Sequence, residues 1–134
     1  MKKIKEILYK NALKAAKIGE IPVSAVITFN GKIISKAYNL REKNNDVLGH
    51  AEIVAIKKAS KRLKRWNLSD CEMYVTLEPC DMCKEIIKQS RIKKVYYFLG
   101  NDKKINSKVN FKKVDDELSD KMLKEMKKFF EKRR

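Results

Sequence analysis

The chain of 134 residues is long enough for one domain with its own hydrophobic core, which we expect to span residues 1–134. No apolar run approaches the roughly 18 residues of a transmembrane helix, and no signal-peptide core follows the charged N-terminus, so we expect a cytoplasmic protein with no membrane partner. The formal net charge of +16 favours a polyanionic partner such as nucleic acid, but 27 of the 33 basic residues are Lys, as an AT-rich coding sequence alone would also produce.

The first part of the chain predicts a helix followed by a β-hairpin. Apolar residues recur at helical spacing between lysines over residues 2–18, which indicates an amphipathic helix that ends at Gly19. Two β-rich runs, residues 21–29 and 32–38, flank Asn30-Gly31, the strongest short hairpin signal. The first two strands of the sheet are therefore predicted to form a β-hairpin with a tight turn.

A polar, irregular stretch over residues 39–49 predicts a loop that brings Asn39 and Asp46 close to His50. From His50 onward the pattern becomes helical, with two opposite faces. The inward face is apolar and the outward face is basic: Ile53, Val54 and Ile56 against Lys57, Lys58, Lys61 and Arg62.

Strands and helices alternate in the next stretch. A strand is expected over residues 72–77, with one apolar face made of Met73, Val75 and Leu77. A helix follows over residues 80–90, and residues 93–98 form a strongly apolar strand. This alternation predicts an α/β sandwich with a partly parallel sheet, a fold that keeps its chemistry outside the carboxyl ends of the strands.

The C-terminal part predicts a turn at residues 99–102, a short lysine-protected edge strand over residues 109–114 and a final helix. The helix opens with acidic residues 115–117, as the helix dipole favours. Its apolar stripe consists of Leu118, Met122, Met126, Phe129 and Phe130. Its basic side either binds RNA phosphates or is an ordinary solvated face. This side consists of Lys121, Lys124, Lys127, Lys128, Lys132, Arg133 and Arg134.

Two short motifs together supply the donor set of a catalytic zinc site. If Pro79 precedes the first turn of a helix, Cys80 and Cys83 lie on one face of that turn, where the helix dipole favours their thiolates. His50, the only histidine of the chain, supplies a third ligand. Glu52 follows it by two residues, which on a helix turns its side chain away by roughly 200°, so that proton transfer suits it better than metal ligation.

Three protein ligands leave one tetrahedral position open, as in catalytic rather than structural zinc sites. Zinc lowers the pKa of a water molecule in that position towards about 7. Taken singly the motifs have other interpretations, because a Cys-x-x-Cys pair is also found in redox sites and structural zinc sites. The third cysteine, Cys71, argues against a disulfide framework and is expected to be a small, partly buried strand residue unless it closes the site as a fourth ligand.

The combination of His-x-Glu with Pro-Cys-x-x-Cys is the signature of zinc nucleobase deaminases. The chain resembles bacterial tRNA adenosine deaminases over nearly its whole length, and the matching residues are 19–26, Asn39, Asp46, 50–53, 74–80, 82–83, 90–92, Phe129-Phe130 and Arg133-Arg134.

This resemblance implies a cytidine deaminase-like fold, a three-layer α/β/α sandwich around a central mixed five-stranded sheet, and a homodimer. It implies one Zn²⁺ ion per subunit held by His50, Cys80 and Cys83, with Glu52 as the catalytic proton shuttle. It also implies a substrate pocket for the base, made by Asn39, Pro22, Val23 and Leu77.

The chain departs from the family at three places. Ser24 occupies a position that is usually Gly, and Val47-Leu48-Gly49 replaces the usual Pro-Thr-Ala before the histidine. The Gly- and Ala-rich loop that normally follows the fourth strand is missing. An RNA-contacting Asp of that loop therefore corresponds either to Asn101 or to Asp102.

The function implied by the resemblance is the hydrolytic deamination of the wobble adenosine to inosine in the anticodon loop of tRNA. One alternative is a deaminase of a free base or nucleoside such as guanine or cytosine, which would depend far less on salt than an RNA enzyme does. Another is a non-catalytic structural-zinc RNA-binding module, which needs a fourth protein ligand such as Cys71.

Overall fold

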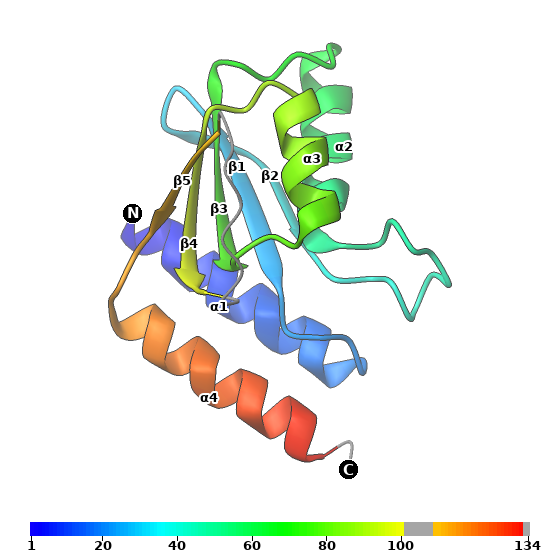
Figure 1. Ribbon diagram of the computed structural model, residues 1–134, viewed down its shortest axis with the longest axis vertical. Coiled ribbons are helices and arrows are strands. Elements are labelled where there is room, and N and C mark those ends of the chain that lie inside the picture. Colours follow the sequence, from blue (N-terminus) through cyan, green and yellow to red (C-terminus); the bar gives the residue numbers. More distant parts are fainter. Residues whose placement is uncertain (101–108, 133–134) are drawn as a thin grey trace.

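The computed structural model describes residues 1–100 and 109–132. Its elements in chain order are α1 (Lys2–Lys17), β1 (Ser24–Phe29), β2 (Lys32–Tyr38), α2 (Ala51–Leu63), β3 (Cys71–Leu77), α3 (Asp81–Gln89), β4 (Lys94–Leu99), β5 (Asn110–Lys113) and α4 (Glu117–Glu131) (Figure 1). The strands form one open sheet in the order β2-β1-β3-β4-β5. β1 is antiparallel to β2 and β3, whereas β3, β4 and β5 run parallel, so the sheet is mixed as expected.

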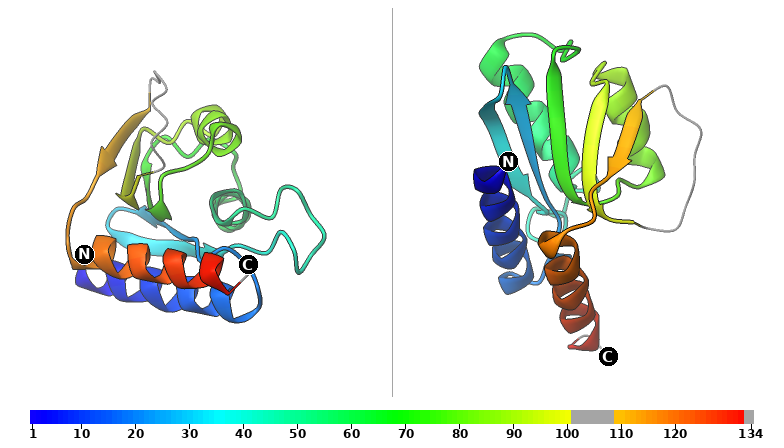
Figure 2. Two further views of the ribbon diagram at one scale, coloured as in Figure 1. Left: turned by 60° about the horizontal axis from the view of Figure 1, so that its bottom comes forward. Right: turned by 90° about the vertical axis from the view of Figure 1, so that its left-hand side faces the viewer.

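The sheet separates two layers of helices (Figures 1 and 2). α2 and α3 cover one face, and their apolar residues join Ile27, Met73 and Val75 in the larger core cluster. α1 and α4 lie side by side on the other face, over a smaller cluster that contains Leu8 and Phe98. The predicted three-layer α/β/α sandwich is therefore confirmed. In the part of the chain that the structure describes, no helix has the length and apolarity needed to cross a membrane.

One boundary differs clearly from the sequence prediction, since β1 begins at Ser24 and not near Ile21. Pro22 has no N–H to donate to a neighbouring strand, and the Val23 amide donates to the Ile21 carbonyl at 2.7 Å. The hairpin turn is as predicted, because Asn30-Gly31 has φ values of 51° and 75°, the two positive angles of a type I′ turn. The other predicted bounds that fall on described residues lie within two residues of the observed ones.

Both edges of the sheet are protected against pairing with further strands. At the β2 edge, Lys58 donates to the Lys36 carbonyl at 3.1 Å and Arg62 donates to the Ile34 carbonyl at 3.2 Å. These two side chains of α2 occupy acceptors that another strand would need. At the opposite edge β5 exposes lysines, as the sequence predicts. The expected turn after β4 reaches residues 101 and 102, which lie outside the described residues.

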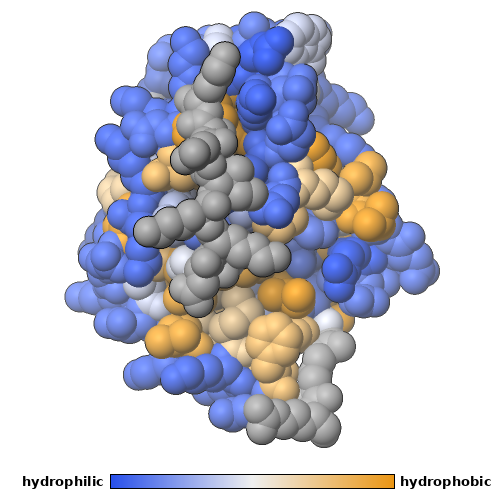
Figure 3. Space-filling model, in the orientation of Figure 1, coloured by the Kyte–Doolittle hydropathy of each residue, from blue (hydrophilic) through white to orange (hydrophobic). Residues whose placement is uncertain are grey.

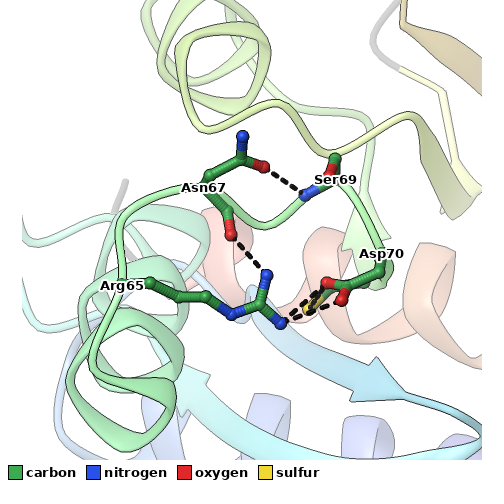
Figure 4. A network of polar contacts seen from close by, with 5 residues as sticks. Arg65, Asn67, Ser69 and Asp70 are labelled. Atoms are coloured by element: carbon green, nitrogen blue, oxygen red, sulfur yellow. Dashed lines mark hydrogen bonds and ion pairs between the residues drawn. The ribbon is translucent and has the colours of Figure 1, made fainter.

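The connection from α2 to β3 is held by a compact polar network (Figure 4). Arg65 contacts both carboxylate oxygens of Asp70 at 2.9 Å and donates to the Asn67 carbonyl at 2.8 Å. The Asn67 side chain accepts the Ser69 amide at 2.9 Å. α2 enters this connection through Lys64, whose left-handed backbone, with φ 57° and ψ 40°, is usually occupied by glycine.

We expect the substitution Lys64→Gly to stabilise the protein. A side chain in the left-handed region costs roughly 1–2 kcal/mol, and glycine removes that cost but loses more chain entropy on folding. The free energy of unfolding in urea should therefore rise by about 0.5–1 kcal/mol. Lys64→Ala is the matched control, since it keeps the Cβ atom and the strain. An equal gain in both variants would contradict this explanation.

Candidate metal centre and base pocket

The three candidate ligands lie at the N-termini of two neighbouring helices. His50 is the N-cap residue of α2, Cys80 is the N-cap residue of α3, and Cys83 lies in the first turn of α3. Both N-cap residues have extended backbone, and the His50 side chain makes no capping hydrogen bond to α2. The imidazole is therefore available to another partner, whereas backbone N–H groups of the first turn of α3 point at the Cys80 sulfur.

The spacing of the ligand atoms matches a single metal ion. The three atoms lie within 4.8 Å of one another, and Nδ1 of His50 is 3.9 Å from Sγ of Cys80 and 3.5 Å from Sγ of Cys83. A tetrahedral ion with Zn–S bonds of about 2.3 Å and a Zn–N bond of about 2.0–2.1 Å would place nitrogen and sulfur about 3.6 Å apart. The donor set fits zinc in both type and spacing. Among the described residues this is the one such group of His, Cys, Asp and Glu side chains.

The two thiols of this group titrate very differently. A hydrogen bond from Cys83 and backbone N–H groups at the N-terminus of α3 lower the pKa of Cys80 to about 5, against the opposing effect of burial. The hydrogen bond to Cys80 and burial raise the pKa of Cys83 far above its usual range, and the nearby Glu52 carboxylate adds to this. Two adjacent thiolates and a carboxylate repel one another, and a divalent cation would offset that repulsion.

Glu52 lies in the first turn of α2 and is only 4% exposed. Burial raises the pKa of its carboxyl group to about 7, although hydrogen bonds from its own amide and from Cys83 act in the opposite direction. Glu52 is not part of the group of ligand atoms that lie together. The helical angle used for the sequence prediction does not apply, because His50 lies outside the helix with φ −72° and ψ 141°.

A cavity of about 470 Å³ opens beside the metal centre. Of the four residues that the sequence predicted for base binding, Asn39, Val23 and Leu77 line it, but Pro22 does not. Pro22 is buried, and its neighbour Ile21 takes the place at the wall. Other lining residues that the sequence did not single out for the pocket are Arg41, Glu78, Asp81 and Met82. Figure 3 shows hydrophobic surface gathering in the lower half of that view, near the C-terminal half of α4.

Asn39 links the pocket to the N-terminus of α2. Its side-chain oxygen Oδ1 accepts a hydrogen bond from the backbone N–H of Ala51 at 2.9 Å, and its backbone N–H donates to the Val23 carbonyl at 3.0 Å. Because the side-chain oxygen is engaged by Ala51, the donors that Asn39 can offer to a base are those of its amide nitrogen. The same residue therefore supports the position of His50 and forms part of the pocket wall.

The loop between β2 and α2 is closed by backbone contacts. The Leu40 amide donates to the Gly49 carbonyl at 2.8 Å, and a Cβ atom added at Gly49 would lie 2.7 Å from backbone atoms of Arg41. A side chain at position 49 would clash with the backbone of Arg41, which explains why this chain has glycine where the family usually has alanine. Asp46, predicted near His50, accepts the Leu48 amide within the loop at 2.9 Å and does not line the cavity.

The buried carboxylate of Glu20 anchors this loop from the segment between α1 and β1. Its two oxygens accept the backbone amides of Glu42 and Lys43 at 3.1 Å and 2.7 Å. The sequence alone gave no sign of this contact, because the residues are more than 20 positions apart. The loop that carries Arg41 is thus fixed at both its ends and its middle.

Cys71 is buried at the first position of β3, and burial raises the pKa of its thiol to about 11. The strand places it six residues before Leu77, a distance of about 20 Å at 3.3 Å per residue. It cannot complete the metal centre at the other end of β3. Its predicted position in a strand is confirmed.

A family model for MafB19-like deaminases matches residues 1–134. The chain is 47% identical over 117 residues to a tRNA-specific adenosine deaminase of Aquifex aeolicus, a match that covers 84% of this chain and 77% of the relative. It is 46% identical over 88 residues to a tRNA-specific adenosine deaminase of Bacillus subtilis, a match that covers 66% of this chain and 55% of the relative.

Solved structures are similar in fold. A structure from studies of A-to-I editing by tRNA:A34 deaminases at the wobble position of transfer RNA has a TM-score of 0.76 and 27% identity, and the match covers 84% of this chain and 98% of that chain. A guanine deaminase of Bacillus subtilis has a TM-score of 0.70 and 35% identity, with coverage of 74% and 64%. The metal-site signature thus lies on a deaminase fold.

A buried ion pair is formed by residues close in sequence to the two cysteines. Lys84 follows Cys83 in α3, is 6% exposed, and contacts the Glu78 carboxylate at 2.8 Å. Its ammonium group also lies 5.3 Å from the centre of the Phe111 ring of β5. The Glu78 amide donates to the Leu99 carbonyl at 2.7 Å. The pair therefore ties the turn before Cys80 to the last two strands of the sheet.

We expect Lys84→Met to destabilise the protein by about 3 kcal/mol, because it removes the ammonium group that offsets the largely buried Glu78 charge. The double variant Lys84→Met/Glu78→Gln removes both charges and should recover most of that loss. Urea unfolding of the two variants measures the difference. If both lose the same stability, packing of the lysine stem and not the charge pair would be responsible.

Proposed function

The chain belongs to the tRNA-specific adenosine deaminases of the MafB19-like deaminase family, and from this membership we propose that it converts the wobble adenosine of a tRNA anticodon to inosine by hydrolysis. One observation carries the proposal. In a chain 47% identical to such an enzyme, a zinc-type donor set and a buried carboxylate lie together beside a cavity of suitable size for a nucleoside.

We propose that His50, Cys80 and Cys83 hold one zinc ion, as their spacing supports. When bound, zinc supplies a Lewis acid that activates water near neutral pH. The adenosine is flipped out of the loop so that its base enters the pocket. Asn39 donates its amide hydrogens to the purine, while Val23 and Leu77 contact its faces.

Glu52 moves the protons of the reaction. It takes a proton from the attacking water, delivers one to N1 of the adenine, and protonates the amino group that leaves C6 as ammonia. Its position beside Cys83 places it next to the donor set, and its burial keeps bulk water from competing for these protons. Water and adenosine are consumed, and inosine and ammonia are formed.

The proposed partner is the anticodon stem-loop of a tRNA, in keeping with the net charge of +16. A homodimer and a cytoplasmic location, expected from the resemblance and the sequence, remain predictions. Asn101 and Asp102, the two candidates for an RNA-contacting residue, lie outside the described residues.

The comparisons favour tRNA over a free base. The chain is 46–47% identical to two curated tRNA-specific deaminases and 35% identical to a guanine deaminase structure. A structural-zinc module would need a fourth protein ligand, and Cys71 is too far away to be one. Incubating the protein with anticodon stem-loop RNA and, separately, with adenosine, guanine and cytosine would test the choice. Inosine should form only in the RNA, and ammonia released from guanine instead would contradict the proposal.

We expect Glu52→Gln to lower kcat by about 10²- to 10⁴-fold while zinc stays bound, because the amide cannot transfer protons but does not disturb the ligands. Inosine formation and zinc content, measured by metal analysis of the purified protein, check both parts. His50→Ala is the matched control and should lose zinc as well as activity. Loss of zinc from Glu52→Gln would show that Glu52 is a ligand.

A further inference from the structure

The positive charge of the protein is unevenly distributed among its helices. α1 contains six lysines and one glutamate, a net charge of +5, and α2 contains four basic residues and one glutamate, a net charge of +3. α4 contains four lysines and four acidic residues over Glu117–Glu131 and is therefore neutral. Among these helices the greatest excess of positive charge lies on α1, whereas from the sequence only the basic side of the C-terminal helix was considered for contact with RNA.

Four lysines of α1 form what we call the α1 lysine row: Lys3, Lys10, Lys14 and Lys17. At 100° and 1.5 Å per residue, they fall within a sector of roughly 60° and extend over about 21 Å. All four are exposed, and none forms an ion pair with a carboxylate among the described residues. Lys5, which lies on another side of the helix, is paired with Asp116 of the capping turn of α4.

Adjoining hollows connect the base pocket to one end of the row. The pocket shares three lining residues with a hollow of about 160 Å³: Ile21, Asn39 and Arg41. That hollow shares Gly19 and Phe129 with another of about 480 Å³, between the C-terminal ends of α1 and α4. Lys17, the last member of the row, lines this outer hollow. Figure 2 shows α1 and α4 side by side.

We propose that the α1 lysine row binds the phosphate backbone of the RNA stem that carries the substrate loop, an inference that rests on the proposed function. With the target base in the pocket, the strand that leaves it follows the hollows to Lys17, and the stem lies along α1. Duplex RNA is recognised mostly through its shape, phosphates and 2′-hydroxyls, so a row of ammonium groups is sufficient without base contacts.

α2 is less suited to this role, although it is also basic. Two of its four cations, Lys58 and Arg62, already donate to carbonyl groups of the β2 edge. The other two, Lys57 and Lys61, are exposed and four residues apart, as Lys10 and Lys14 are on α1. The two pairs therefore offer a matched comparison, with equal charge and spacing on different helices.

The test compares Lys10→Ala/Lys14→Ala with Lys57→Ala/Lys61→Ala in the zinc-loaded protein. Each variant is given an anticodon stem-loop and a linear RNA with the loop sequence alone, and kcat and KM for inosine formation are measured. Binding of each RNA is followed separately by fluorescence anisotropy over a range of salt concentrations. Circular dichroism confirms that both variants are folded.

We expect the α1 variant to bind the stem-loop about 10- to 30-fold more weakly near 0.15 M salt, with KM raised and kcat unchanged, as the loss of two phosphate contacts predicts. The slope of log K against log salt should decrease by about 1.4–1.8. Neither effect should appear with the linear RNA, and the α2 variant should change less than twofold with both.

Equal losses in the two variants, or no loss in the α1 variant, would overturn the proposal. The proposal would also be overturned if the wild-type protein did not bind the stem-loop but did bind vesicles with anionic lipids, and the α1 variant did not bind these vesicles. Failure of the wild-type protein to form inosine from either RNA would contradict the proposed function instead. In that case the anisotropy measurements would still decide whether the row binds the stem.

Discussion

The candidate chemistry depends on how two helix N-termini are capped at one edge of the sheet. An N-cap side chain usually accepts the free N–H groups of its own helix. At α3 this position is held by Cys80, whose sulfur faces backbone N–H groups of the first turn, whereas at α2 it is held by His50, whose side chain makes no such bond. For α2 the Ala51 amide is satisfied by Asn39, which lies twelve positions earlier. Because a residue of another segment does the capping, the imidazole remains available as a metal ligand.

The sequence was sufficient for what local spacing determines and insufficient for what only packing determines. The two cysteines and the histidine could be proposed as metal ligands because residue type and spacing can be read from the sequence, and the structure brings the three side chains together. Pro22 does not line the cavity, whereas its neighbour Ile21 does, and the sequence could not place the two because it did not show where β1 begins. The Lys84–Glu78 pair was missed because burial turns an ordinary charged pair into a structural one, and burial depends on β5. For the same reason the Glu20 contact was not foreseen.

One of the three departures from the family, Val47-Leu48-Gly49, lies in the loop before the metal centre, and the structure explains its glycine. At Gly49 the backbone of Arg41 leaves no room for a side chain, so that the loop closes more tightly than an alanine there would permit. Arg41 also lines the pocket. The residue before the first candidate ligand therefore packs directly against the backbone of a residue in the pocket wall.

Chemistry and affinity are assigned to opposite layers of this sandwich. The layer of α2 and α3 supplies the donor set and Glu52, whereas the layer of α1 and α4 supplies the proposed surface for the RNA stem. Charges in water are screened over about 8 Å at physiological salt. Lysines of α1 that lie farther than this from the metal centre therefore have little effect on the titration of Glu52, and under the proposed function their substitution would change mainly the affinity for RNA.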